Sequence, residues 1–171
     1  MPAPLPFDPV ARAGESWQRC YPDAGEPVYS AMRAVTSIMR AQQILIAGLD
    51  TALRPFNLTF SRYEALVLLT FSSTGALPLS KIGERLQVHA TSVTNVVDRL
   101  EASGFVKREP NPRDGRGTLA VITEAGREVA DAATQELHRN RFGLQSLDQD
   151  DLDRLFGTLR RLRADAGDFV E

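Results

Sequence analysis

The sequence predicts a mainly α-helical protein with one small β-hairpin, in which helices at both ends of the chain flank a central lobe. Three observations predict this fold class. Apolar residues recur in steps of three and four over long stretches near both ends of the chain. Two short helical patterns separated by a three-residue gap occupy residues 79–104. Two strand-like runs joined by a turn-rich loop follow at once, over residues 105–122.

The composition is that of an ordinary globular chain. Of the 171 residues, 43% are hydrophobic and 25% are charged, and the formal net charge is −2. Residues 81–116 hold seven Lys or Arg against five Asp or Glu, whereas residues 145–171 hold four against seven. No apolar run reaches the roughly 20 residues that span a bilayer, and no secretory signal pattern opens the chain. With Cys20 as its one cysteine, the chain is expected to be cytoplasmic and to lack an internal disulfide.

Residues 1–27 are expected to form an extension that is partly disordered or carries a short helix. Prolines at positions 2, 4, 6, 9, 22 and 27 favour extended backbone. The stretch VARAGESWQRCYP between them has the length of two or three helical turns. Trp17 is expected to dock this segment as a packing anchor, with a ligand contact as the alternative.

A long helix is predicted over residues 28–53. Its apolar stripe advances in steps of four and three, with Gln42 in one skipped slot, and consists of Val28, Met32, Val35, Met39, Ile46, Leu49 and Leu53. A near-heptad repeat of this length is typical of a seam between two helices. Packing within a single subunit is the alternative. Pro55 and Asn57 end the helix.

Two further helices are predicted before the central turn. Ser61 and Glu64 have the spacing of a capping box, which predicts a helix start at Ser61. The nearly continuous apolar run over residues 65–71 predicts that this helix is buried. Pro78 and Ser80 introduce the next helix. Its inward-facing positions are Leu79, Ile82 and Leu86.

A three-residue turn at residues 87–89 leads into the most informative helix. Val93, Val96, Val97 and Leu100 fall at i, i+3, i+4 and i+7 and form one apolar face. The opposite face carries Thr91, Ser92, Thr94, Asn95, Asp98 and Arg99. Short hydroxyl and amide side chains suit contact with base edges and phosphates, although a capped, solvated helix face explains Thr91 or Ser92 taken alone. His89 is expected to be a polar surface residue or a phosphate neighbour.

The strand-like runs follow Gly104, which is placed to stop the helix. The loop at residues 110–117 is too long for a tight hairpin and is expected to project from the body. Arg113 and Arg116 near its tip are placed to reach a minor groove, where a cation meets concentrated negative potential. Asp114 either holds Arg116 in position or simply forms an Asp-Gly turn. The whole segment has the outline of a helix-turn-helix with a wing.

Two amphipathic helices complete the chain. The first begins near Thr123, with Val129, Ala133, Leu137 and Leu144 along one side. The second begins near Gln149, with apolar positions at Leu152, Leu155, Leu159, Leu162, Ala166 and Phe169. Long amphipathic helices at both ends of the chain predict that the ends pack together as a dimer interface.

Residues 28–169 resemble the multiple antibiotic resistance regulator (MarR) family of transcription factors. The most specific element is Asp114-Gly-Arg116, followed by alternating apolar residues and then Thr123 and Glu124-Ala-Gly126. It is similar to the wing signature of that family. The helix before the wing adds Thr91-Ser92, Val96-Val97, Arg99-Leu100-Glu101 and Gly104-Phe105-Val106.

The resemblance implies a winged helix-turn-helix lobe at residues 57–123 and a helical dimerisation region at residues 28–56 and 124–171. It also implies a homodimer on a pseudo-palindromic operator, acting as a repressor that a small aromatic or anionic molecule releases. The DNA-contacting residues expected on these grounds and on the pattern above are Ser80, His89, Thr91, Ser92, Thr94, Asn95, Arg99, Arg113, Asp114 and Arg116. Arg116 would be the minor-groove finger, oriented by Asp114.

The residues expected to line an effector pocket are Trp17, Met32, Thr36 and Tyr63. Urate-responsive members carry a Trp in an extra N-terminal helix, which Trp17 resembles. They use an Asp where this chain has Glu64 and an Arg where Val96 falls, so the sequence departs from their pattern. Redox-sensing members place a reactive Cys at the start of the first long helix, whereas Cys20 precedes that helix.

Two alternatives to a ligand-released repressor are a redox-responsive regulator acting through Cys20 and a winged helix used for protein–protein contact. An enzyme is not expected, since the chain has two histidines, His89 and His138, and no nucleophile elbow or phosphate-binding glycine loop. Two histidines and one cysteine do not make up a typical structural zinc site. We therefore expect no metal and no cofactor.

Overall fold

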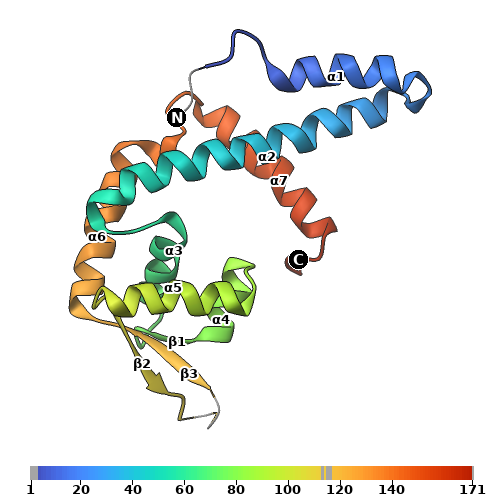
Figure 1. The fold of residues 1–171 in the computed structure, drawn as a ribbon. Helices are drawn as coiled ribbons and strands as arrows, with labels where there is room; N and C mark the ends of the chain where they lie inside the picture. Colours follow the sequence, from blue (N-terminus) through green and yellow to red (C-terminus); the bar gives the residue numbers. More distant parts are fainter. Residues whose placement is uncertain (1–3, 113, 115–116, 171) are drawn as a thin grey trace.

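The computed structural model describes residues 4–112, 114 and 117–170 (Figure 1). Its α-helices are α1 (Pro9–Cys20), α2 (Glu26–Leu53), α3 (Phe60–Phe71), α4 (Leu79–Leu86), α5 (Ala90–Ala102), α6 (Glu124–Arg139) and α7 (Gln149–Asp165). Its strands are β1 (Ala76–Pro78), β2 (Val106–Pro110) and β3 (Thr118–Ile122). Short 3₁₀ turns lie at Pro22–Ala24, Arg54–Phe56 and Arg141–Gly143. The predicted fold class, mainly helical with a small β wing, is confirmed.

The sheet has three antiparallel strands in the order β1-β3-β2, and not the two that the sequence predicts. Strand β1 pairs Leu77 with Ala120, and β2 pairs Arg108 with the same residue from the other side. Strand β1 has three residues and ends in a proline, so it carries too little alternation to be read as a strand. Strands β2 and β3 extend away from the helices as the wing (Figure 1).

The hydrophobic core fills the central lobe, which we define as residues 57–123, and continues onto α6. Its fully buried side chains include Leu53, Leu66, Leu69, Ile82, Val93, Val97, Leu100 and Leu137. The apolar face predicted for α5 is confirmed, because Val93, Val97 and Leu100 are buried and Val96 packs against the core. The lobe therefore shares one packed core with the C-terminal end of α2 and with α6.

The predicted capping box at the start of α3 is wrong. The helix begins at Phe60, one residue before Ser61, and no side chain of its own caps it. The backbone N–H of Phe60 instead donates to the Asp50 carboxylate on α2, over 2.7 Å. Because this cap comes from a residue ten positions upstream, no local spacing could reveal it. Glu64 is consequently free of any capping role and faces a cavity described below.

The predicted ends of the last two helices are also corrected. Helix α6 stops at Arg139, because Arg141 and Phe142 have positive φ values of 45° and 52°, so Leu144 lies beyond the helix. Helix α7 stops at Asp165, which places Ala166 and Phe169 after it. The ring of Phe169 is contacted by two arginines of α7, with Arg160 Cζ 4.9 Å and Arg163 Cζ 5.6 Å from its centroid.

Helix α1 packs along the N-terminal half of α2 (Figure 1). Tyr29 on α2 holds the segment that follows α1. Its hydroxyl lies within hydrogen-bond distance of the carbonyl oxygens of Tyr21, at 2.6 Å, and Pro22, at 2.9 Å. Trp17 is 41% exposed and lies against the ring of Tyr21. The anchor of this segment is thus the buried Tyr29 rather than Trp17.

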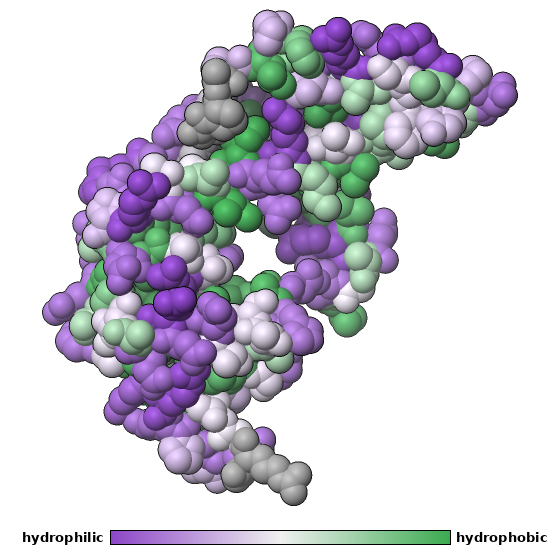
Figure 2. All heavy atoms as spheres, viewed as in Figure 1, coloured by the Kyte–Doolittle hydropathy of each residue, from purple (hydrophilic) through white to green (hydrophobic). Residues whose placement is uncertain are grey.

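The arms, defined as α2 and α7, keep many apolar side chains at the surface. No residue of α7 is buried, and α7 makes few contacts with the rest of the described chain. The exposed apolar residues of the arms are Val28, Val35, Ile38, Met39, Ile44, Ile46, Leu155, Phe156 and Leu162. Figure 2 shows apolar surface distributed along this region. Within the described residues, no helix combines the length and apolar character needed to cross a membrane.

Candidate nucleic-acid interface

Helices α4 and α5 cross closely around a tight turn. Gln87 ends α4 in the left-handed conformation, with φ of 53°, and its backbone N–H bonds back to α4. A Cβ added to Gly83 on α4 would lie 3.1 Å from Val93 on α5 and 3.2 Å from the carbonyl oxygen of Val88. A side chain at this position would push α5 away. The small residue therefore sets the close crossing of a helix-turn-helix.

Helix α5 is capped by His89. The backbone N–H of Thr91 donates to Nδ1 of His89 over 3.3 Å, and Nδ1 also lies 3.1 Å from the Thr91 hydroxyl. An N-cap acceptor satisfies one of the backbone donors that open a helix. His89 thus orients the first turn of α5, and its exposed ring remains at the edge of the surface on which the other predicted contact residues lie.

The predicted contact residues of α5 share one exposed face. Thr91, Ser92, Thr94, Asn95 and Arg99 are exposed, opposite the buried Val93, Val97 and Leu100. The Thr94 hydroxyl donates to the carbonyl of Ala90 over 3.1 Å, so it is partly engaged within the helix. Ser80, at the start of α4, and Thr94 line one shallow groove of about 590 Å³ between α4 and α5. The structure brings together all the predicted contacts that α4 and α5 carry.

Arg108 joins the wing to α5, and the sequence reasoning missed it. Its guanidinium donates to Asp98 over 2.7 Å and to Glu101, while its backbone N–H donates to the other Glu101 oxygen over 3.1 Å. Burial lowers the pKa of Arg108, but the hydrogen bonds and charges of Glu101 and Asp98 outweigh burial and raise it above its ordinary value. The side chain is a fixed cation that ties β2 to the helix.

The wing tip is a compact turn in its described part. The backbone N–H of Asn111 donates to the carbonyl of Gly117 over 2.9 Å, and the N–H groups of Asp114 and Gly117 donate to the carbonyls of Asn111 and Asp114. Arg113 and Arg116 lie outside the described residues. The Asp114 turn is present, whereas its predicted pairing with Arg116 stays a prediction.

The Thr-x-x-Gly signature forms the joint behind the wing. The Thr123 hydroxyl donates to the carbonyl of Gly104 over 2.8 Å and accepts from the N–H of Gly126 over 3.0 Å. A Cβ on Gly126 would lie 2.1 Å from the carbonyl oxygen of Phe105. One threonine therefore caps α6 and holds the end of α5, and the glycine permits the close approach of α6 to the segment entering β2.

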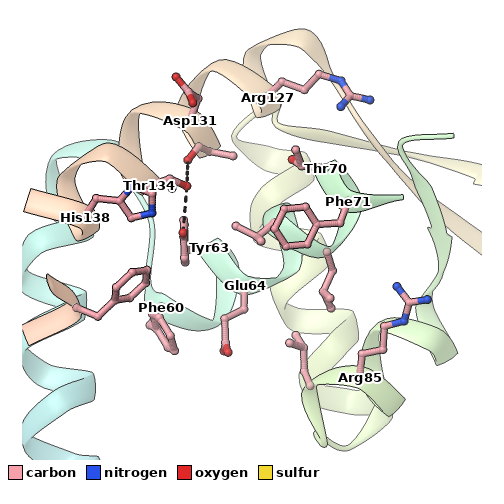
Figure 3. Close-up of a pocket in the computed structure, with 15 residues that line it drawn as sticks. Phe60, Tyr63, Glu64, Thr70, Phe71, Arg85, Arg127, Asp131, Thr134 and His138 are labelled. Atoms are coloured by element: carbon pink, nitrogen blue, oxygen red, sulfur yellow. Dashed lines mark hydrogen bonds between the residues drawn. The ribbon is translucent and has the colours of Figure 1, made fainter. Parts of the chain in front are cut away.

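The four predicted effector residues do not come together. Tyr63 lines an open cavity of about 640 Å³ whose walls come from α3, α4, α6 and the turn after α6 (Figure 3). Its hydroxyl lies 3.0 Å from the Thr134 hydroxyl of α6. Trp17 lies on α1, and Met32 and Thr36 lie on α2, where the Thr36 hydroxyl donates to the Met32 carbonyl over 2.8 Å. None of these three lines the cavity. Cys20 is an exposed, free thiol.

The described residues contain no group of three or more His, Cys, Asp or Glu side chains placed to hold a metal ion. Among the described residues of the α5 face and the wing, each charged side chain is exposed or paired with another side chain. The chemistry of this face is therefore hydrogen bonding and charge, presented by one short helix and an adjoining hairpin.

Comparison with known proteins identifies this arrangement. Residues 60–118 match the sequence model of the MarR family. The chain is 58% identical to Sco5413 of Streptomyces coelicolor, described as a MarR family transcriptional regulator; the match covers 86% of this chain and 100% of that one, with a TM-score of 0.78. The sequence is 34% identical to the HTH-type transcriptional regulator YkoM of Bacillus subtilis over 104 residues, 60% of this chain and 67% of that protein.

A second structure from Streptomyces coelicolor shows a similar chain bound to DNA. Sco3205, described as a MarR family transcriptional regulator in complex with DNA, is 25% identical, and the match covers 78% of this chain and 84% of that one with a TM-score of 0.66.

Proposed function

The chain belongs to the MarR family of transcriptional regulators, and we propose that it reads operator DNA through α5 and the wing. Regulators of this family are not enzymes, which confirms the prediction that this chain is not one. The observation that carries the proposal is the exposed face of α5, where Thr91, Ser92, Thr94, Asn95 and Arg99 stand opposite a buried apolar face. These side chains offer donors and acceptors of the kind that contact bases and phosphates.

The wing acts with α5 as one surface. Arg108 fixes β2 against Asp98 and Glu101, so the position of the hairpin depends on the helix. A helix in the major groove and a hairpin tip beside it then contact adjacent grooves of the same duplex. Arg113 and Arg116 of the tip are proposed as minor-groove contacts. The DNA complex of Sco3205 supports this use of the fold.

We infer that the protein acts as a homodimer. The arms expose Val35, Met39, Phe156 and Leu162, and a second copy would remove this apolar surface from water. In this arrangement residues 28–56 and 124–171 hold the two copies together, and residues 57–123 form each reading lobe. A two-fold symmetric dimer matches a pseudo-palindromic operator, with recognition helices about one DNA turn, roughly 34–36 Å, apart.

We further propose that the regulator represses transcription until a small molecule binds. The cavity lined by Tyr63 supports a ligand-responsive role, because its walls come from α4 of the helix-turn-helix and from α6. A ligand that prefers one relative placement of these helices over another would shift the population of DNA-binding forms.

Genome-wide footprinting of the bound protein, followed by binding to the recovered site, tests this function. We expect Arg116→Ala to weaken binding to the recovered site at least about tenfold while the fold is retained, because a minor-groove cation is lost. Arg154→Ala, which removes an exposed charge of α7, is the matched control and should bind normally. Unchanged binding of Arg116→Ala would overturn the assignment of the wing.

Base preference gives a second test of the same function. Asn95→Ala should alter which bases are preferred more than it alters overall affinity, since an amide that contacts base edges carries sequence information. A uniform loss over all sequences would instead make Asn95 a contact to the DNA backbone.

A further inference from the structure

The cavity beside Tyr63 has the size and walls of a small-molecule site. It measures about 640 Å³, within the range of ligand pockets. Helix α3 supplies one wall, α6 the second, α4 the third, and the turn after α6 closes one end. Figure 3 shows the ring of Phe71 between Tyr63, Thr134 and His138 on one side and Arg85 on the other.

Aromatic rings dominate the cavity walls. Phe60 and Tyr63 stack with ring centroids 6.1 Å apart, and Phe142 forms part of the wall near the end of α6. Phe71 is 78% exposed, although a phenylalanine normally gains from being buried. A large ring left at the mouth of a cavity provides a face on which a planar ligand can stack.

One carboxyl group of the cavity wall, that of Glu64, has no partner among the described residues. Among the residues that the structure describes, no hydrogen bond or ion pair reaches the carboxyl of Glu64, which is about half buried. Loss of water around this carboxyl raises the pKa of Glu64 above its ordinary value. Figure 3 shows the guanidinium groups of Arg85 and Arg127 on the other side of the Phe71 ring. A carboxyl that is desolvated and unpaired favours a ligand that brings a positive charge.

We propose that this cavity binds an aromatic cation, with its ring system against Phe71 and its positive charge paired with Glu64. The proposal deepens the proposed function, on which it rests, by naming the chemical class of the effector. Aromatic faces attract cations as well as rings, so Phe60 and Tyr63 add to the attraction of the carboxylate. An anionic ligand would meet the unpaired Glu64 carboxylate and would have to be held by Arg85 or Arg127.

The cavity borders both the helix-turn-helix and the junction between α6 and α7. Arg85 and Leu86 belong to α4, the first helix of the helix-turn-helix, and Phe142 belongs to the turn between α6 and α7. That turn is strained, because Phe142 has φ of 52°, and Asn140 before it buries a side-chain oxygen that has no hydrogen-bond partner within the described chain. The Phe142 end of the cavity therefore lies where the arm joins the lobe.

Calorimetric titration of the full chain, without DNA, with three ligands of matched shape tests the proposal. These are 2-naphthamidine, a cation; 2-naphthamide, which is neutral; and 2-naphthoate, an anion. We expect the amidine to bind about tenfold or more tightly than the amide, because it adds a charge-assisted hydrogen bond to Glu64, and the carboxylate to bind most weakly. Tightest binding of the carboxylate, or absence of binding by all three, overturns the proposal.

Two variants locate the site. Glu64→Gln should bring the affinities of the amidine and the amide within about threefold of each other, whereas Glu128→Gln, an exposed glutamate on α6 outside the cavity, should keep the difference. Phe71→Ala changes an exposed residue and should weaken both ligands. If Glu64→Gln retains the full preference for the amidine, the cation binds elsewhere and the proposal is wrong.

DNA binding is measured separately on the same preparations. A protein that binds the operator but not the amidine overturns only the ligand class. A protein that binds the amidine at Glu64 but no duplex DNA retains the ligand site and overturns the proposed function.

Discussion

The central lobe and the arms differ in where they keep their apolar side chains. In the lobe, Leu66, Val97 and Leu100 are almost completely buried, so one copy of the chain covers its own core. In the arms, Val35 and Phe156 are 54% and 62% exposed, and α7 has no buried residue at all. Helices with equally clear apolar stripes thus have different surroundings.

This difference separates what one copy of the chain stabilises from what a second copy must supply. A helix stripe that packs within the subunit contributes to the free energy of unfolding of that subunit. A stripe left at the surface contributes only when another surface covers it. Substitutions in the lobe should therefore change folding, whereas substitutions in the arms should change association.

The largest effect is expected for Leu66→Ala in the lobe. Removal of a fully buried leucine side chain should lower the free energy of unfolding by about 2–5 kcal/mol, through lost burial and the cavity left behind. Urea unfolding followed by circular dichroism measures it. The matched substitution Leu162→Ala on α7 should cost the isolated subunit far less, because that side chain is 55% exposed. Equal losses at both positions would contradict the distinction between lobe and arms.

A pair of glycine substitutions comes next. Gly126→Ala should lower the free energy of unfolding by about 1–3 kcal/mol, since its Cβ would lie 2.1 Å from the carbonyl oxygen of Phe105 and α6 would have to shift. Gly48→Ala on α2 meets no atom within 4 Å and should not destabilise the subunit. Thermal unfolding of the two variants under the same conditions tests this prediction. A Gly126→Ala variant as stable as the unmodified protein would show that the joint behind the wing is loosely packed.

A charge placed on the arm should act on association. Val35→Lys introduces an ammonium group into the exposed stripe of α2 and should raise the dimer dissociation constant at least about tenfold, measured by analytical ultracentrifugation. Ser37→Lys adds the same charge on the other side of the helix and should leave association unchanged. If both variants raised the dimer dissociation constant equally, a general effect of charge would explain the result, and the exposed stripe of α2 would not be the dimer contact.

The smallest effect is expected for the pH dependence contributed by Glu64. Its pKa in the folded chain is raised above the ordinary value of 4.5, so the folded state holds this proton to higher pH than the unfolded state does. The free energy of unfolding therefore falls as pH rises from about 4.5 through the folded pKa, and then levels off. Glu64→Gln should remove this part of the slope in unfolding measured from pH 4 to 8. A slope unchanged by Glu64→Gln would show that Glu64 is not desolvated.

The sequence predicts those parts of the fold that local periodicity encodes. The stripes of α2 and α5 and the stop at Gly104 appear where the pattern places them. The start of α3 and strand β1 were not predictable in this way, because Asp50 caps α3 from another helix and β1 exists only through pairing with β3. Contacts between distant residues have no local signature.

In the candidate site, too, local spacing predicts some features and contacts between distant residues determine the others. The exposed face of α5 follows from helical spacing, and the structure has it as predicted. Arg108 was missed although the sequence held one signal. It lies two residues after the buried Val106 on β2 and therefore on the same, inward face of the strand. A charged residue at such a position requires partners. The predicted effector residues are scattered over three helices, because Trp17 lies on α1, Met32 on α2 and Tyr63 on α3 of the lobe.

The salt dependence of binding to the recovered operator tests the central claim, that α5 and the wing read duplex DNA, most directly. If the dimer neutralises about six phosphates, affinity should fall about a thousandfold between about 50 and 200 mM salt, because bound counterions are released from the DNA. Arg99→Gln on the exposed face of α5 should make that slope shallower if Arg99 contacts a phosphate. An affinity that stays flat over this range would contradict the claim and leave the winged helix as a surface for protein partners.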